Sequence, residues 1–68
     1  MNNIMVITFK DGEQVRRYTE TKDEDFIVNN YFSTFGEEVE KIVVWWSNGF
    51  LKNIYTYWMD YGVNHSKK

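Results

Sequence analysis

The sequence predicts an α+β fold in which two β-hairpins flank one helix, in the order ββαββ. Two dipeptides, Asp11-Gly12 and Asn48-Gly49, each separate two runs rich in β-branched and aromatic residues, the pattern of a hairpin. Between the hairpins, apolar residues recur at helical spacing. This order predicts a mostly antiparallel four-stranded sheet with one helix packed on one face.

The first hairpin comprises strands at about 3–10 and 13–19. Its loop has two alternatives. A two-residue loop puts Gln14, Arg16 and Tyr18 on the same face as the apolar residues of the first strand. A three-residue loop, with Gly12 in the left-handed region, gives Val15 these apolar neighbours instead, and we favour it for that reason.

The helix is predicted at about 22–35. Thr21 and Glu24 have capping-box spacing, in which each side chain bonds the backbone amide near the other. Gly36 supplies a C-terminal cap with positive φ. One broad apolar stripe faces the sheet: Ile27, Val28, Tyr31, Phe32 and Phe35.

The second hairpin comprises strands at about 38–47 and 50–58 around a type I′ turn at Asn48-Gly49. A two-residue loop pairs Trp45 with Lys52 and makes both faces apolar. One face holds Ile42, Val44, Trp46, Leu51, Tyr55 and Tyr57, and the other holds Val39, Val43, Trp45, Phe50, Ile54 and Trp58.

Two lysines decide which of these faces the helix covers. Lys41 and Lys52 fall on the second face, and burying an unpaired lysine is costly, so that face is expected to remain open. In the alternative, the first hairpin or the tail covers it as ordinary core. Trp and Tyr concentrate at protein interfaces, so the candidate partner-binding residues are Lys41, Val43, Trp45, Phe50, Lys52, Ile54 and Trp58.

Acidic residues gather at both ends of the predicted helix. They suit helix capping and a solvated edge, and they also suit a negative surface for a basic target. Whether the two clusters meet depends on the strand order, which the sequence leaves open. The candidate acidic surface comprises Glu20, Asp23, Glu24, Asp25, Glu37, Glu38 and Glu40.

Composition excludes several functional classes. With 68 residues the chain forms one domain, and it has no cysteine for a disulfide or thiolate metal site. Its one histidine, His65, lies in a tail at about 62–68 that is expected to fray. No catalytic constellation can be assembled from these residues, so we expect neither an enzyme nor a bound metal or cofactor.

Charge and hydropathy bear on partners and location. The net charge of −2 disfavours nucleic acid as a partner, because affinity for phosphate comes from many lysines and arginines. The longest apolar run, 42–46, is too short to span a membrane, and Met1-Asn2-Asn3 lacks the basic start of a signal peptide. We therefore expect a cytoplasmic protein with no membrane partner.

These observations predict a small non-enzymatic protein-binding module whose partner is another protein or a second copy in a homodimer. In size, acidity and aromatic content the chain resembles the stoichiometric inhibitors and adaptors that phages and mobile elements direct at host or defence enzymes, anti-CRISPR proteins among them. That resemblance is one of composition and implies a nucleic-acid-processing enzyme as target. The alternatives are a sheet surface that binds single-stranded nucleic acid and a structural homo-oligomer subunit.

Overall fold

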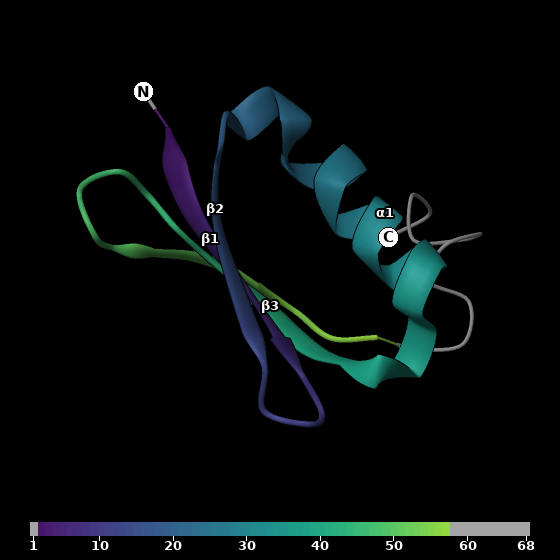
Figure 1. Cartoon of the computed structure of the whole chain (residues 1–68). Helices are drawn as coiled ribbons and strands as arrows, with labels where there is room; N and C mark the ends of the chain where they lie inside the picture. Colours follow the sequence, from purple (N-terminus) through teal and green to yellow (C-terminus); the bar gives the residue numbers. More distant parts are fainter. Residues whose placement is uncertain (1, 58–68) are drawn as a thin grey trace.

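A computed structural model describes residues 2–57 and confirms the predicted ββαββ order. One helix packs against one face of a four-stranded antiparallel sheet (Figure 1). Trp58, His65 and the tail at 62–68 lie outside the described residues. Within the described part of the chain, no helix is long and apolar enough to cross a membrane. The elements are β1 (Asn3–Phe9), β2 (Gln14–Thr19), the 3₁₀ turn η1 (Thr21–Asp23), α1 (Glu24–Phe35), the 3₁₀ turn η2 (Gly36–Glu38), β3 (Val39–Trp45) and β4 (Leu51–Tyr55).

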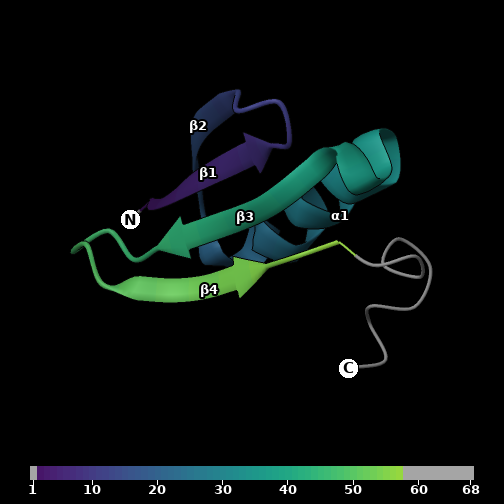
Figure 2. The ribbon, with the colours of Figure 1, turned by 90° about the horizontal axis from the view of Figure 1, so that it is seen from below.

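The strand order is β2-β1-β3-β4, and every neighbouring pair is antiparallel. The first strands of the two hairpins, β1 and β3, therefore lie side by side in the centre of the sheet, with β2 and β4 at its edges (Figure 2). This pairing makes β1 and β3 the strands that share the core.

The core lies between α1 and the two central strands. It contains buried residues of β1, α1 and β3, namely Met5, Ile7, Val28, Phe32, Val39, Ile42 and Val44. Tyr55 and Tyr57 pack against this cluster, and the rings of Phe32 and Tyr57 lie 5.7 Å apart. The prediction that Ile42, Val44, Tyr55 and Tyr57 face the helix is therefore confirmed.

The loop of the first hairpin has three residues, as favoured from the sequence. The Phe9 N–H donates to the Glu13 carbonyl (2.8 Å), and Gly12, with φ 97°, donates its N–H to the Phe9 carbonyl (2.9 Å). The register places Val15 opposite Ile7, on the helix side of the sheet.

The second hairpin has the same loop geometry, so the predicted type I′ turn is wrong. The Trp46 N–H donates to the Phe50 carbonyl and the Gly49 N–H to the Trp46 carbonyl, both at 2.8 Å. Gly49 has φ 98°, whereas Asn48 does not have the positive φ that a type I′ turn requires. The Asn48 side-chain oxygen instead accepts the Phe50 N–H at 3.1 Å, an arrangement that stabilises a three-residue loop.

Two irregularities in the ladders of β3 change which residues share a face. Trp45 pairs with Leu51 and Val44 with Asn53, which leaves Lys52 as an extra residue in β4. The predicted pairing of Trp45 with Lys52 is therefore wrong. On the other side of β3, Lys41 pairs with Thr8 and Val39 with Phe9, so Glu40 is extra and Val39 turns into the core.

The ends of α1 differ in part from the prediction. No side chain caps its first turn, so the predicted capping box is wrong. The Thr21 hydroxyl accepts a hydrogen bond from the Asn3 side chain (3.0 Å), and Glu24 is directed toward the sheet. Gly36 has a positive φ of 60°, as expected, although its ψ of −136° lies outside the left-handed helical region.

Candidate protein-binding surfaces

The sheet face opposite α1 is crossed by two rows of side chains that run over all four strands. In the first row, Tyr18, Ile4, Trp45 and Leu51 are successive cross-strand partners, and in the second, Arg16, Val6, Val43 and Ile54 are. Within the described chain this face carries no helix, because α1 lies on the other side (Figure 1). We call these eight residues, with Lys41 beside them, the open face.

The open face exposes large apolar side chains at both edges of the sheet. Tyr18 of β2 is 59% exposed, and Leu51 and Ile54 of β4 are 55% and 59% exposed. The central members, Ile4, Val6, Val43 and Trp45, are half-buried by their neighbours. Single exposed apolar residues are normal, but contiguous rows of this length mark contact surfaces.

Charge is segregated on this face. Arg16 and Lys41 are its charged members, and no carboxylate occupies any of its paired positions. The whole chain, in contrast, carries a net charge of −2. The open face is therefore a positive, apolar surface on a negative molecule.

The structure brings together four of the residues predicted for this surface and separates two others. Lys41, Val43, Trp45 and Ile54 lie on the open face. Lys52 does not, since the irregularity in β4 turns its side chain toward the helix. Phe50 lies opposite Trp46 and not opposite Ser47, as a two-residue loop would require, and it is 72% exposed at the end of the hairpin. Trp58 is outside the described residues.

Lys52 belongs to a polar cluster around Glu24 of α1. Its ammonium lies 2.6 Å from a Glu24 carboxylate oxygen and 4.8 Å from the ring centroid of Trp46. The other carboxylate oxygen accepts bonds from the Asn53 side chain (2.9 Å) and the Tyr55 hydroxyl. This cluster ties the first turn of α1 to β4.

Glu24 is charged although it is only 2% exposed. Burial by itself would raise the pKa of this carboxyl, but the hydrogen bonds from Lys52, Tyr55 and Asn53, together with the charge of Lys52, hold the pKa below its ordinary value. Glu24 was expected on an acidic surface. That placement is wrong, because the side chain links two elements of the fold.

The other six residues predicted for the acidic surface form two separate groups. Glu20, Asp23 and Asp25 are exposed around the start of α1, and Glu37, Glu38 and Glu40 are exposed around its end. The two groups lie at opposite ends of the helix (Figure 1), so they do not form one surface.

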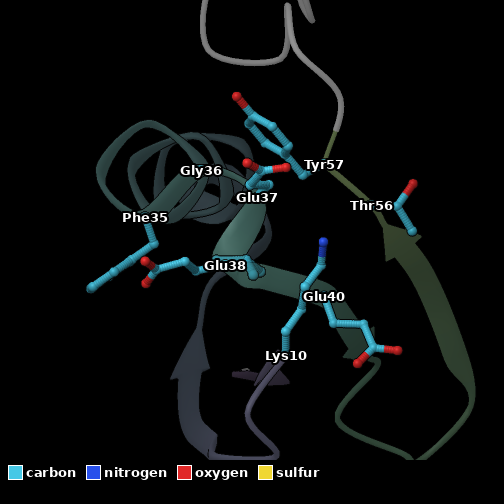
Figure 3. A pocket seen from close by; sticks show the side chains of 9 residues that line it. Lys10, Phe35, Gly36, Glu37, Glu38, Glu40, Thr56 and Tyr57 are labelled. Atoms are coloured by element: carbon cyan, nitrogen blue, oxygen red, sulfur yellow. The ribbon is translucent and has the colours of Figure 1, made fainter.

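The second acidic group lines a cavity of about 770 Å³ at the end of α1. Lys10, from the loop of the first hairpin, lines the same cavity, as do Thr56 and Tyr57 (Figure 3). The Lys10 N–H also donates to the Glu38 carbonyl at 2.9 Å, which joins the first hairpin to η2. The lysine places a positive charge among the three glutamates.

Neither a metal centre nor a known relative guides the assignment. Among residues 2–57, no three His, Cys, Asp or Glu side chains gather closely enough to hold a metal ion. Comparison with known proteins found no matching protein-family model, no matching curated protein and no matching solved structure. The function must therefore be argued from the surfaces themselves.

The first hairpin contributes four residues that were not predicted for this site: Ile4, Val6, Arg16 and Tyr18. The alternation of β1 already separates Ile4 and Val6 from the buried Met5 and Ile7. Their place beside Trp45 and Val43 could be inferred only with the strand order in hand. Leu51 was predicted on the helix side and is brought to the open face by the loop geometry.

Proposed function

We propose that this protein is a non-enzymatic binding module that contacts another protein through the open face, as a stoichiometric inhibitor or adaptor. The observation that carries the proposal is the row Tyr18, Ile4, Trp45 and Leu51, which crosses every strand and, within residues 2–57, has no helix over it. Trp and Tyr, both present in this row, are over-represented among the residues that dominate the free energy of binding at protein interfaces.

Charge supports a partner with an acidic surface. Arg16 and Lys41 lie beside the apolar residues of the open face. A partner with carboxylates at matching positions would associate faster with this face, and the charge pairs would fix its orientation on the face. Two copies packed face to face through this surface would instead bring four positive charges together with no carboxylate to pair them. A different protein suits the open face better than a second copy does.

The chemistry of the face also favours protein over single-stranded nucleic acid. Bases stack on flat aromatic rings, whereas most of the two rows is aliphatic, with Ile4, Val6, Val43, Leu51 and Ile54 against two aromatic residues. Lys52, which would have added a third positive charge, is paired with Glu24 on the other side of the sheet.

Site-specific photo-cross-linking tests the proposal. A photoreactive amino acid at position 54, on the open face, is compared with one at position 26, on α1, because Ile54 and Phe26 are similarly exposed (59% and 68%). We expect one adduct with a different protein, formed from position 54 and absent from position 26. Adducts from both positions alike, adducts only with the chain itself, or adducts with nucleic acid would overturn the proposal.

The identified partner then provides a second check. Arg16→Glu and Lys41→Glu each change an exposed side chain, so the fold should be retained, while binding to an acidic partner should weaken about tenfold or more. Affinity that stays the same in both variants would contradict the assignment of an acidic partner.

A further inference from the structure

We propose that β2 pairs with β2 of a second copy of this chain, in an antiparallel arrangement centred on Val15, so that two molecules share one continuous sheet. This interface uses the backbone edge of β2, whereas the open face uses side chains that project from one side of the sheet, and Arg16 takes part in both. The tests at Glu13 and Arg17, which lie on the helix side of β2, leave the open face unchanged, so the inference can fail without the proposed function failing.

The two edges of the sheet differ in their capacity to accept another strand. Within residues 2–57, β2 pairs only with β1 and β4 only with β3 (Figure 2). The extra residue Lys52 disrupts β4, and an irregularity of this kind hinders the addition of another strand at that edge. In contrast, β2 is regular through six consecutive pairs and contains no extra residue.

The backbone of β2 presents a defined set of free groups. The Phe9 N–H bonds to the Glu13 carbonyl, so bonded and non-bonded positions alternate from there along the ladder. Gln14, Arg16 and Tyr18 therefore direct their N–H and C=O groups away from β1. A strand added at this edge would satisfy them.

The side chains of β2 complement those of β2 in a second copy when the two strands run antiparallel. In an antiparallel pair centred on Val15, the two Val15 side chains meet, and Glu13 of each copy lies opposite Arg17 of the other. Gln14 of each copy lies opposite Arg16 of the other, and those two residues exchange their free backbone hydrogen bonds. The segment from Glu13 to Arg17 therefore places opposite charges across from each other when it pairs antiparallel with the same segment of a second copy.

The helix side of this edge has an unfilled cavity with both apolar and charged lining residues. A cavity of about 690 Å³ lies between the first hairpin and the end of α1, with Phe9, Val15, Tyr31 and Phe35 among its lining residues. The rings of Phe9 and Phe35 meet edge to face at 5.2 Å, yet Val15 and Phe35 stay 38% and 42% exposed. Val15 of a second copy would pack on this exposed edge, next to the first Val15.

The path of α1 leaves room for the second copy. The helix starts at Glu24, which bonds to β4, and ends at Phe35, which packs on Phe9 of β1. It therefore crosses the sheet diagonally and leaves most of β2 uncovered, and Gln14–Tyr18 is exposed throughout. Pairing through β2 would therefore use an edge that the helix leaves exposed.

Solution mass over a wide concentration range provides the first test. We expect a concentration-dependent dimer, measured by light scattering or sedimentation. In each of the variants Glu13→Arg and Arg17→Glu, both cross-strand charge pairs become like-charged, and we expect the dimer dissociation constant to rise about tenfold or more. A wild-type chain that stays monomeric, or single variants that dimerise normally, would overturn the inference.

A charge exchange separates this interface from any other mode of association. An equal mixture of the Glu13→Arg chain and the Arg17→Glu chain restores two opposite-charge pairs, so we expect a heterodimer from two chains that fail to dimerise alone. The double variant Glu13→Arg/Arg17→Glu should dimerise by itself for the same reason. No recovery in either case would overturn the assigned register.

The backbone bonds have a test of their own. Arg16→Pro removes an N–H that points away from β1, so the monomer should keep its circular dichroism spectrum and unfolding midpoint while the dimer is lost. Unchanged dimerisation of a folded Arg16→Pro chain would contradict strand pairing at this edge.

Discussion

At the scale of single residues, Glu24 shows how a local pattern can be overridden by a contact distant in sequence. Its place three residues after Thr21 predicts a cap, and its acidic neighbours predict an exposed surface. The structure uses the carboxylate to bind Lys52, Asn53 and Tyr55, 28 to 31 residues away. A buried ion pair contributes little net stability by comparison with an apolar pair, but removing one partner is costly.

Glu24→Gln is therefore expected to lower the free energy of unfolding by about 2–4 kcal/mol, because Lys52 is left without its counter-charge in a half-buried site. The matched control is Asp23→Asn, one residue earlier and exposed, which should cost less than about 1 kcal/mol. Urea unfolding of the two variants checks this. Equal losses in both would show that the Glu24 cluster has no special role.

The same carboxyl gives stability a defined pH dependence. Folding lowers the pKa of Glu24 below its ordinary value of 4.5, so the unfolded chain binds more protons in that range and stability rises with pH. The contribution is complete above about pH 5 and is lost as the pH falls through the folded pKa. The difference in unfolding free energy between the wild type and Glu24→Gln should therefore shrink in acid, as urea unfolding at a series of pH values will reveal. A difference that stays constant or widens in acid would contradict this account.

At the scale of elements, the two hairpins use one loop design. In both, a glycine with φ of 97° or 98° closes a three-residue loop. In both, a side-chain oxygen of the loop accepts the backbone N–H of the residue two positions later: the Glu13 N–H donates to Asp11, and the Phe50 N–H donates to Asn48. The sequence predicts the hairpins but not this loop in the second one. Asn-Gly is compatible with both loops, and the choice depends on how Trp46 and Phe50 pair.

Substitutions at Asn48 and Gly49 distinguish the two loops. In the observed loop Asn48→Gly removes the acceptor of the Phe50 N–H and adds backbone freedom to the unfolded chain, so it should cost about 0.5–1 kcal/mol of unfolding free energy. Gly49→Ala should cost about 1 kcal/mol or more from its backbone conformation alone, since an added Cβ meets open space. Thermal unfolding measures both, and a neutral or stabilising Asn48→Gly would indicate a type I′ turn instead.

The helix and strands could be predicted because each has a signal in its own stretch of sequence. The sheet face on which each side chain lies was harder to predict, because a single extra residue in a strand changes the face and leaves no such signal. Alternation carries Ile42 and Val44 correctly to the core. Glu40 and Lys52 are each one residue extra in their strand, and each therefore shifts the alternation of side chains between the two faces. As a result Val39 and Lys52 lie on the helix side and not on the open face. Nothing in the local sequence distinguishes these two positions from regular strand. The candidate site was therefore predicted correctly at Lys41, Val43, Trp45 and Ile54, and wrongly at Lys52 and Phe50, which lie at or beyond the irregularity in β4.

At the scale of the whole molecule, burial is concentrated on one side of a thin sheet. The helix side holds the core, whereas the open face holds Tyr18, Leu51 and Ile54 in largely exposed positions. A chain of this length buries only about 60% of the surface of its unfolded form, so association is a natural supplement to its stability. Pairing through β2 would also place two open faces on one continuous sheet, and so provide two binding surfaces on one particle.

The central claim is that the open face serves binding and not folding, and one comparison tests it most directly. Leu51→Thr/Ile54→Thr changes two exposed residues and should lower the free energy of unfolding by less than about 1 kcal/mol for each. Ile42→Thr, in the buried face of the same hairpin, should be much more costly, by about 2–4 kcal/mol.

The decisive measurement is the affinity of the cross-linked partner, once purified, for the wild type and for Leu51→Thr/Ile54→Thr. We predict that the folded double variant binds at least about tenfold more weakly. Unchanged affinity of a folded double variant would contradict the claim that the open face is the binding surface.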